Sequence, residues 1–204
     1  MKDIAFKKVL VFVNAGVPLL LLLWDWWRGQ LGADPLNFVT RSTGTLTLVF
    51  LLLTLCVTPA RKITGVQWLI RFRRMLGLYA FFYGFVHFLC YLWFDKAFQL
   101  GEVVADVTRR RFILVGMLGF FLMAPLAITS TNAMIKRLGG KRWARLHKLI
   151  YVSAVAGVFH FYLLVKADTT KPLIFALVLA ALLGYRLMVS QQQKTPLRLG
   201  VSDR

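Results

Sequence analysis

Three histidines, His87, His147 and His160, are the residues of this 204-residue sequence whose side chains could most readily do chemistry. Two of them lie deep inside long apolar segments, and His147 lies near the edge of one. An ionisable side chain in such a segment costs free energy unless it has a partner, so it indicates a functional site. Each could be a neutral imidazole that hydrogen-bonds a hydroxyl group on a neighbouring helix. Because carboxylates are nearly missing from the apolar segments, three histidines together favour a metal-ligating role.

His87 and His160 are predicted to lie at the same depth in a membrane. They follow 13 residues after Arg74 and 15 residues after Arg145, the basic residues near the inner ends of their segments. At about 1.5 Å per helical residue, both lie roughly 20–22 Å from the inner surface. Two imidazoles at one height on neighbouring helices can bind the two faces of a haem, and the filled iron then suits electron transfer. A structural zinc ion fits less well because it needs four protein ligands.

His147 differs from the other two because it lies only about 3 Å inside the inner boundary by the same helical rise. At that height the third apolar segment has Arg73, Arg74 or Leu76, none of which is a histidine. A second haem at His147 would therefore be singly ligated or would need an unusual partner.

Six apolar segments must position these histidines. Most approach the roughly 17–25 residues that a helix needs to cross a bilayer, and lipid offers no hydrogen-bond partners to non-helical backbone. The sequence therefore predicts an all-α integral membrane protein, a bundle of six transmembrane helices forming a single domain over 1–204 with a polar tail over 191–204. The expected spans are 9–27, 43–57, 75–94, 112–130, 149–165 and 172–189.

Composition and charge exclude several classes of protein. Hydrophobic residues make up 58% of the chain and charged residues 17%, which rules out a soluble enzyme, a disordered tail protein and a disulfide-stapled secreted domain. The net charge of +18 does not predict nucleic-acid binding, because the basic residues form short clusters between apolar runs.

The distribution of charge predicts the orientation in the membrane. With six spans, 18 of the 26 basic residues lie on the same side of the membrane as both termini. The positive-inside rule then places the N and C termini in the cytoplasm, although the basic run 109–111 falls outside.

Two basic clusters, 71–74 and 141–145, allow two interpretations. They could set the topology by contacting anionic membrane lipids. Alternatively, one or two of their arginines could bind a flavin phosphate or a haem propionate, for which the forked guanidinium group is well suited. Arg74 and Arg145 are the candidates for that role because they lie nearest to the helix starts.

The stretches that carry the histidines, and the segment between them, resemble a known family. They read RRMLGLYAFFYGFVHFLCYLWFD (73–95), RRRFILVGMLGFFLMAPLAITS (109–130) and GGKRWARLHKLIYVSAVAGVFHFYLLVK (139–166), and TPAR occurs at 58–61. This pattern is similar to the ferric reductase-like transmembrane domain, which NADPH oxidases and STEAP reductases share. Within that superfamily, the chain from about residue 18 to about residue 190 looks like the MsrQ (YedZ) family of haem-binding membrane subunits.

The resemblance implies b-type haem, and His87, His147 and His160 match the family's histidines. NADPH oxidases carry two histidines on each of two helices, whereas this chain has Arg73 or Arg74 at the inner position of its third segment. The resemblance also implies a bound FMN, electrons from the respiratory quinone pool, and delivery to the molybdenum-containing methionine sulfoxide reductase MsrP in the periplasm. A soluble flavin and nicotinamide domain like that of the oxidases is not expected within 204 residues.

Two alternatives stay open from the sequence: a cytochrome b subunit of another quinone-linked dehydrogenase, and a transporter or channel gated by histidine protonation. The favoured prediction is a multi-pass protein of the bacterial inner membrane, an electron-transfer subunit rather than the catalytic reductase. A reduced quinone or a flavin would donate electrons near the cytoplasmic half. Haem between His87 and His160 would carry them outward, and a periplasmic reductase would accept them.

Overall fold

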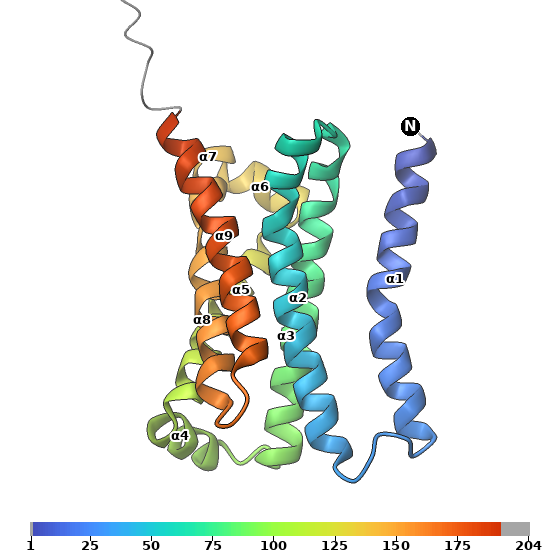
Figure 1. The fold of residues 1–204 in the computed structure, drawn as a ribbon, viewed down its shortest axis with the longest axis vertical. Coiled ribbons are helices and arrows are strands. Elements are labelled where there is room, and N and C mark those ends of the chain that lie inside the picture. The colour runs from blue at the N-terminus through green and yellow to red at the C-terminus, as the bar shows by residue number, and fades with distance from the viewer. Residues whose placement is uncertain (1, 193–204) are drawn as a thin grey trace, which may run out of the picture.

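The described part of the chain, residues 2–192 of the computed structural model, is built from helices and contains no strand (Figure 1). The predicted all-α class is confirmed for these residues, and most of the predicted polar tail, residues 193–204, lies outside them. Six helical stretches are long and apolar enough to cross a membrane, as the sequence predicted. In chain order the elements are α1 (Lys2–Trp27), α2 (Pro35–Thr64), the 3-10 helix η1 (Gln67–Phe72), α3 (Arg73–Cys90), the π-helical turn η2 (Tyr91–Asp95), α4 (Leu100–Arg109), α5 (Arg111–Ile128), α6 (Asn132–Leu138), α7 (Gly140–Leu146), α8 (Leu149–Leu164) and α9 (Thr170–Gln192).

The second span is much longer than the expected 43–57, because α2 has strong signals at both ends. Asp34 caps its start: the Asp34 carboxylate accepts a hydrogen bond of 3.1 Å from the backbone N–H of Asn37, and Pro35 occupies the first helical position. Gly65 ends the helix in the left-handed conformation, with a φ of 72°. Polar residues in the first two turns lower the local hydropathy, which is why the apolar run alone underestimates this helix.

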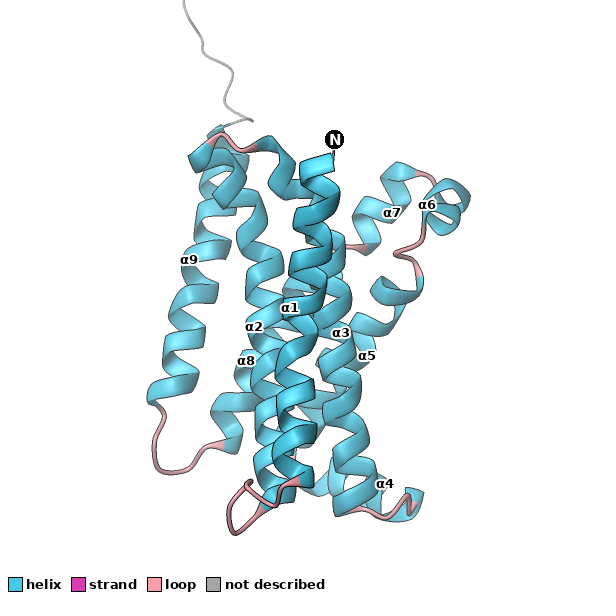
Figure 2. Ribbon diagram, turned by 90° about the vertical axis from the view of Figure 1, so that its right-hand side faces the viewer, coloured by secondary structure: helices cyan, strands magenta, loops and turns pink. Residues whose placement is uncertain are grey.

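Both ends of the described chain lie at the same end of the bundle, as an even number of spans requires (Figure 1). The short helices α6 and α7 lie at this end too, whereas α4 lies at the opposite end (Figure 2). The basic residues of η1 and α7 are therefore gathered at the end that carries the termini. This end is called the inner end below, and the end that carries α4 is called the outer end.

Two helix pairs, α2 with α3 and α5 with α8, pack most extensively. Leu55 of α2 and Tyr83 of α3 are fully buried in the first pair. Small residues allow close approach in the second pair, where the Ser153 hydroxyl donates a hydrogen bond of 2.6 Å to the Gly119 carbonyl. These two pairs contain both of the deep histidines, one on α3 and one on α8.

Helix α1 stands to one side of the bundle (Figure 1). Two tyrosines of α3 attach it: the Tyr79 hydroxyl donates to the Phe12 carbonyl and the Tyr83 hydroxyl to the Ala15 carbonyl, each over 2.7 Å. Only 11% of the apolar window in α1 is buried by the rest of the chain, compared with 50% in α2. Most of its apolar surface is therefore available to lipid.

At the outer end, a buried ion pair holds α4 against the end of α3. The Asp106 carboxylate lies 2.8 Å from the Lys96 ammonium and 3.0 Å from the Arg110 guanidinium, and it accepts a hydrogen bond of 3.2 Å from Tyr91. Burial alone would raise the pKa of Asp106, but the hydrogen bond from Lys96 and the charge of Arg110 outweigh it, so the pKa lies below its ordinary value. The expected spans 75–94 and 112–130 left this segment as a connection with no helix of its own, whereas the structure forms α4 there.

Candidate functional site

The structure brings His87 of α3 and His160 of α8 together between the packed helices. Their ring centroids lie 6.2 Å apart, and the two ring planes are inclined at 77°. Both residues are of intermediate exposure. Of the three predicted histidines, these two form a pair and His147 does not join them.

Each ring of this pair is held by a backbone carbonyl on a neighbouring helix. His87 Nδ1 lies 2.8 Å from the Thr40 carbonyl of α2, and His160 Nδ1 lies 2.6 Å from the Phe112 carbonyl of α5. A carbonyl oxygen only accepts hydrogen bonds, so each Nδ1 must carry the proton and donate it. In a neutral imidazole the lone pair then lies on Nε2 in both residues.

This arrangement fits a metal ion with an imidazole on each side. A ligating histidine characteristically donates its other ring N–H to a carbonyl or carboxylate, which fixes the tautomer and makes the ligand more basic. Metal–imidazole bonds of about 2.0–2.1 Å on either side of one ion require ring centroids about 6 Å apart. The observed separation of 6.2 Å meets that requirement. His87 and His160 could therefore hold a metal ion, such as a haem iron, between them.

His147 lies at the inner end, at the C-terminus of α7, in a different environment. Its ring stacks on Trp143 with a centroid separation of 3.9 Å, and its Nε2 lies 3.2 Å from the Thr129 hydroxyl. The Trp143 indole N–H donates to the Thr129 carbonyl over 2.9 Å, so these three residues form one small cluster. The sequence predicted that His147 is separated in depth from the other two, and the structure places it in this separate cluster.

A cavity of about 270 Å³ opens beside this cluster. Its walls come from α2, η1, α3, α5, α7 and α8, and they combine apolar side chains with a few polar and cationic ones. The polar and cationic lining residues are Thr54, Arg73, Arg74, Ser130, Trp143 and His147. We call this space the inner cavity.

The two arginines singled out from the sequence have different surroundings. Arg74 lines the inner cavity, and its guanidinium donates a hydrogen bond of 2.6 Å to the Asn132 side chain. Arg145 is exposed and is not among the residues that line the cavity. Arg73, which the sequence did not single out as a cofactor-binding residue, does line the cavity and is half-buried. The sequence alone could not tell which arginines of the two basic clusters face the interior of the bundle.

Arg186 of α9 is a further cation of the inner half, and it is partly buried. Its guanidinium donates to the Leu55 carbonyl over 2.6 Å and to the Tyr151 hydroxyl over 3.0 Å, and it lies 5.3 Å from the Tyr151 ring centroid. It therefore ties α9 to α2 and α8 in the inner half. An arginine inside an otherwise apolar span was the available signal for such a role.

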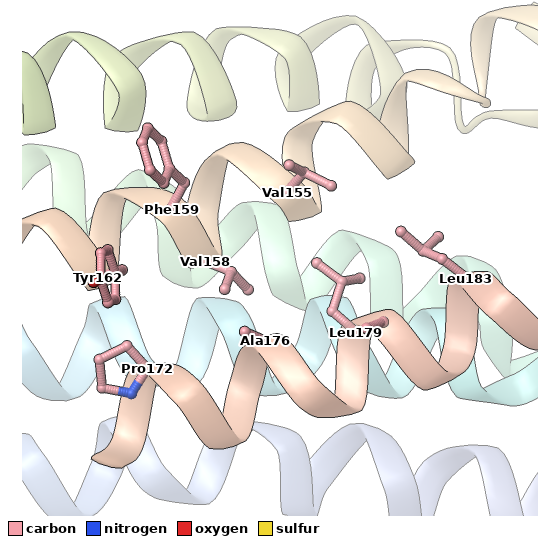
Figure 3. A pocket seen from close by; sticks show the side chains of 9 residues that line it. Val155, Val158, Phe159, Tyr162, Pro172, Ala176, Leu179 and Leu183 are labelled. Carbon is pink, nitrogen blue, oxygen red and sulfur yellow. The ribbon is translucent and has the colours of Figure 1, made fainter. Parts of the chain in front are cut away.

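A second hollow, of about 300 Å³, lies between α8 and α9 (Figure 3). Its walls are apolar except for the hydroxyl of Tyr162. No histidine or charged side chain lines it, so it offers no acid–base or metal-ligating chemistry. The lining residues are Val155, Val158, Phe159, Tyr162, Pro172, Ala176, Leu179, Ala180 and Leu183.

Comparisons with known proteins agree with the description of a multi-pass membrane protein. Residues 43–158 match the model of the family described as ferric reductase like transmembrane component. The chain is 50% identical to a protein of Ralstonia nicotianae over 91% of this chain and 86% of that one. It is 47% identical to a protein of Herminiimonas arsenicoxydans (92% and 87% covered) and 46% identical to one of Rhodospirillum rubrum (92% and 90% covered).

All three relatives are named protein-methionine-sulfoxide reductase heme-binding subunit MsrQ. The match of the family model covers more than half of the chain, and the relatives are covered over most of their length. The chain therefore belongs to the ferric reductase-like transmembrane family and, within it, to the MsrQ family.

Proposed function

We propose that this chain is the haem-binding membrane subunit of a protein-methionine-sulfoxide reductase system. It takes electrons from the quinone pool, directly or through a flavin, and passes them to the periplasmic molybdenum reductase MsrP, which repairs oxidised periplasmic proteins. The names of the relatives support the haem and the reductase system. The chain is then the electron-transfer subunit rather than the catalytic reductase.

The observation that carries this proposal is the pair of histidines with both Nδ1 atoms bonded to backbone carbonyls. His87 and His160 would hold haem b through their Nε2 atoms, and the haem would supply a one-electron couple suited to electron transfer. The carbonyls of Thr40 and Phe112 keep both ligands in the required tautomer and orientation. The surrounding apolar helices keep bulk water away from the pair.

The inner cavity is the proposed place for a second redox group, FMN. Arg73 and Arg74 supply positive charge, and Ser130 and His147 supply hydrogen-bonding groups beside the Trp143 ring. Guanidinium groups bind phosphate with charge-assisted hydrogen bonds, and an indole ring can lie against a planar heterocycle. The propionate of a second haem has the same acidic chemistry, so haem content and flavin content must be measured separately.

The proposed orientation follows from charge. The termini and the basic residues of η1 and α7 lie at the inner end, so the positive-inside rule places that end in the cytoplasm of a bacterial inner membrane. The inner cavity then opens near the cytoplasmic side, where a quinol or flavin donates. The histidine pair lies nearer the outer end, toward the periplasmic partner, and the exposed apolar residues of the spans contact membrane lipid.

The absorption spectrum of the purified protein tests the proposal. The expected result is a Soret band that is lost in His87→Ala and in His160→Ala but kept in Phe159→Ala, a matched change at an exposed position next to His160. A folded, colourless wild-type protein would contradict the haem assignment. It would favour a transporter or channel instead.

A turnover assay tests the electron route. Membranes that contain this chain and MsrP are expected to reduce methionine sulfoxide with a quinol as the only donor, and His87→Ala should abolish this turnover. A haem-loaded protein that supports no turnover with MsrP would favour a cytochrome b subunit of another quinone-linked dehydrogenase. Adding reduced FMN in place of quinol separates a flavin donor from a quinol donor.

A further inference from the structure

The two histidines of the pair are held in the same way on two different helix pairs. His87 of α3 donates to the Thr40 carbonyl of α2, four residues before Gly44. His160 of α8 donates to the Phe112 carbonyl of α5, four residues before Gly116. In an α-helix, the residue four positions after a given residue lies about one turn further along the helix, close to the carbonyl of that residue. Each glycine is therefore next to the carbonyl that accepts the hydrogen bond from the histidine.

Neither glycine has room for a side chain. A Cβ atom at Gly44 would lie 3.0 Å from His87 Cε1 and 3.1 Å from His87 Nδ1. A Cβ atom at Gly116 would lie only 2.6 Å from His160 Nδ1 and 2.8 Å from its Cε1. Because non-bonded carbon atoms prefer separations of about 3.5–4.0 Å, any other residue would push the ring away from its carbonyl.

Other glycines in the same bundle do not have this relationship. A Cβ atom at Gly84 would meet the end of the flexible Met123 side chain at 3.0 Å, and one at Gly77 would lie 3.6 Å from Thr54, an ordinary contact. At Gly184 of α9 no atom lies within 4 Å among the described residues. Only Gly44 and Gly116, of the glycines in the described chain, would meet a histidine ring.

We propose that Gly44 and Gly116 are positioning residues for the redox site: by lacking a side chain, they let each histidine reach a helix carbonyl and so set the tautomer, rotation and basicity of both ligands. This inference rests on the proposed haem site. A hydrogen bond from Nδ1 makes the imidazole a stronger electron donor, which stabilises the ferric state relative to the ferrous state. Losing that hydrogen bond raises the midpoint potential.

The test compares Gly44→Ala and Gly116→Ala with Gly84→Ala and Gly184→Ala as matched controls. Alanine normally favours a helix over glycine, so a general loss of helix stability is not expected in any of them. The midpoint potential should rise in both test variants, and more in Gly116→Ala because its clash is closer. A tenfold change in the ferrous-to-ferric ratio at fixed potential corresponds to about 59 mV for one electron, and Gly116→Ala should reach that scale.

The electron paramagnetic resonance spectrum of the ferric protein gives a second readout, because it depends on the orientation of the two imidazole planes. Changed g-values in the two test variants and unchanged values in the controls support the proposal. Loss of haem from a folded test variant, with haem retained in the controls, supports it too. Wild-type potentials and spectra in Gly44→Ala and Gly116→Ala overturn it.

Nitrogen NMR of histidine-labelled wild-type protein without haem keeps the proposal falsifiable if the test variants do not fold. His87 and His160 should both show a protonated Nδ1 and an unprotonated Nε2. A protonated Nε2 on either residue overturns the inference. This measurement also distinguishes a failure of the inference from a failure of the proposed function. A wild-type protein that never binds haem would contradict the proposed function, whichever tautomer the two histidines have.

Discussion

His147 Nε2 lies 3.2 Å from the Thr129 hydroxyl, and that hydroxyl also lies 2.6 Å from the Pro125 carbonyl. The carbonyl can only accept, so the hydroxyl proton goes to it and the hydroxyl oxygen accepts from His147. His147 therefore carries its proton on Nε2, whereas His87 and His160 carry theirs on Nδ1. His147 is therefore a hydrogen-bond donor at the wall of the inner cavity, and its tautomer differs from that of His87 and His160.

Replacing His147 tests this distinction. His147→Gln keeps a donor near Thr129 and should leave the amount of haem per protein unchanged, because the ring is not one of the paired ligands. The pyridine haemochrome assay measures that ratio, with His160→Gln as the variant that should lose haem. A fall from two haems to one in His147→Gln would show that His147 ligates a second haem.

Arg74 and Arg145 make a matched pair for testing the inner cavity. Arg74 lines the cavity and Arg145 does not, although both are exposed arginines at the inner end. Hydrogen bonds to charged groups are worth about 1.5–3 kcal/mol, so Arg74→Gln should weaken FMN retention by roughly tenfold or more. Arg145→Gln should leave it unchanged. Flavin fluorescence during dialysis measures the retention, and equal losses in both variants would place FMN elsewhere.

Tyr83 should matter for how firmly α1 is held. Its hydroxyl is fully buried and donates to the Ala15 carbonyl, so Tyr83→Phe removes one hydrogen bond between α1 and α3 while keeping the ring. A loss of about 0.5–1.5 kcal/mol in the free energy of unfolding is expected. Thermal unfolding in detergent measures it, with Tyr162→Phe as the control because Tyr162 is 45% exposed. Equal stability of the two variants would contradict a role for this bond.

The Asp106 ion pair predicts a pH dependence at the outer end. The pKa of Asp106 is lower in the folded protein than its ordinary value of about 3.9, because the Lys96 hydrogen bond and the Arg110 charge outweigh the effect of burial. The ionised carboxylate therefore stabilises the fold above that ordinary value, and this contribution disappears as the pH falls through the lowered pKa. The fold should be less stable below about pH 4 than at pH 6.

The variant Asp106→Asn isolates this contribution. Between about pH 5 and pH 7 the wild-type carboxylate is ionised, so the melting temperature of Asp106→Asn should lie below that of the wild type. The difference between the two melting temperatures should shrink as the pH falls below about 4. Glu102→Gln, at an exposed position of the same helix, should behave like the wild type throughout. A difference between wild type and Asp106→Asn that does not change with pH would refute the assignment to ionisation.

Much of the architecture was predictable because hydropathy and helical rise are local properties. Apolar runs identified the six spans, and counting residues from Arg74 and Arg145 put His87 and His160 at one depth. The bounds of α2 were less accurate, since its polar first turns hide the helix from a hydropathy count. The Asp34–Pro35 start and the Gly65 end were available as capping signals and would have corrected them.

The sequence by itself determined that this is a six-span helical membrane chain with two histidines at matched depth. Only the tertiary structure decided that their Nδ1 atoms meet the Thr40 and Phe112 carbonyls, that Arg73 and not Arg145 lines the inner cavity, and that Arg186 bridges three helices. The reason is physical: the spacing along one helix sets height and face, whereas hydrogen-bond partners depend on how neighbouring helices rotate and pack.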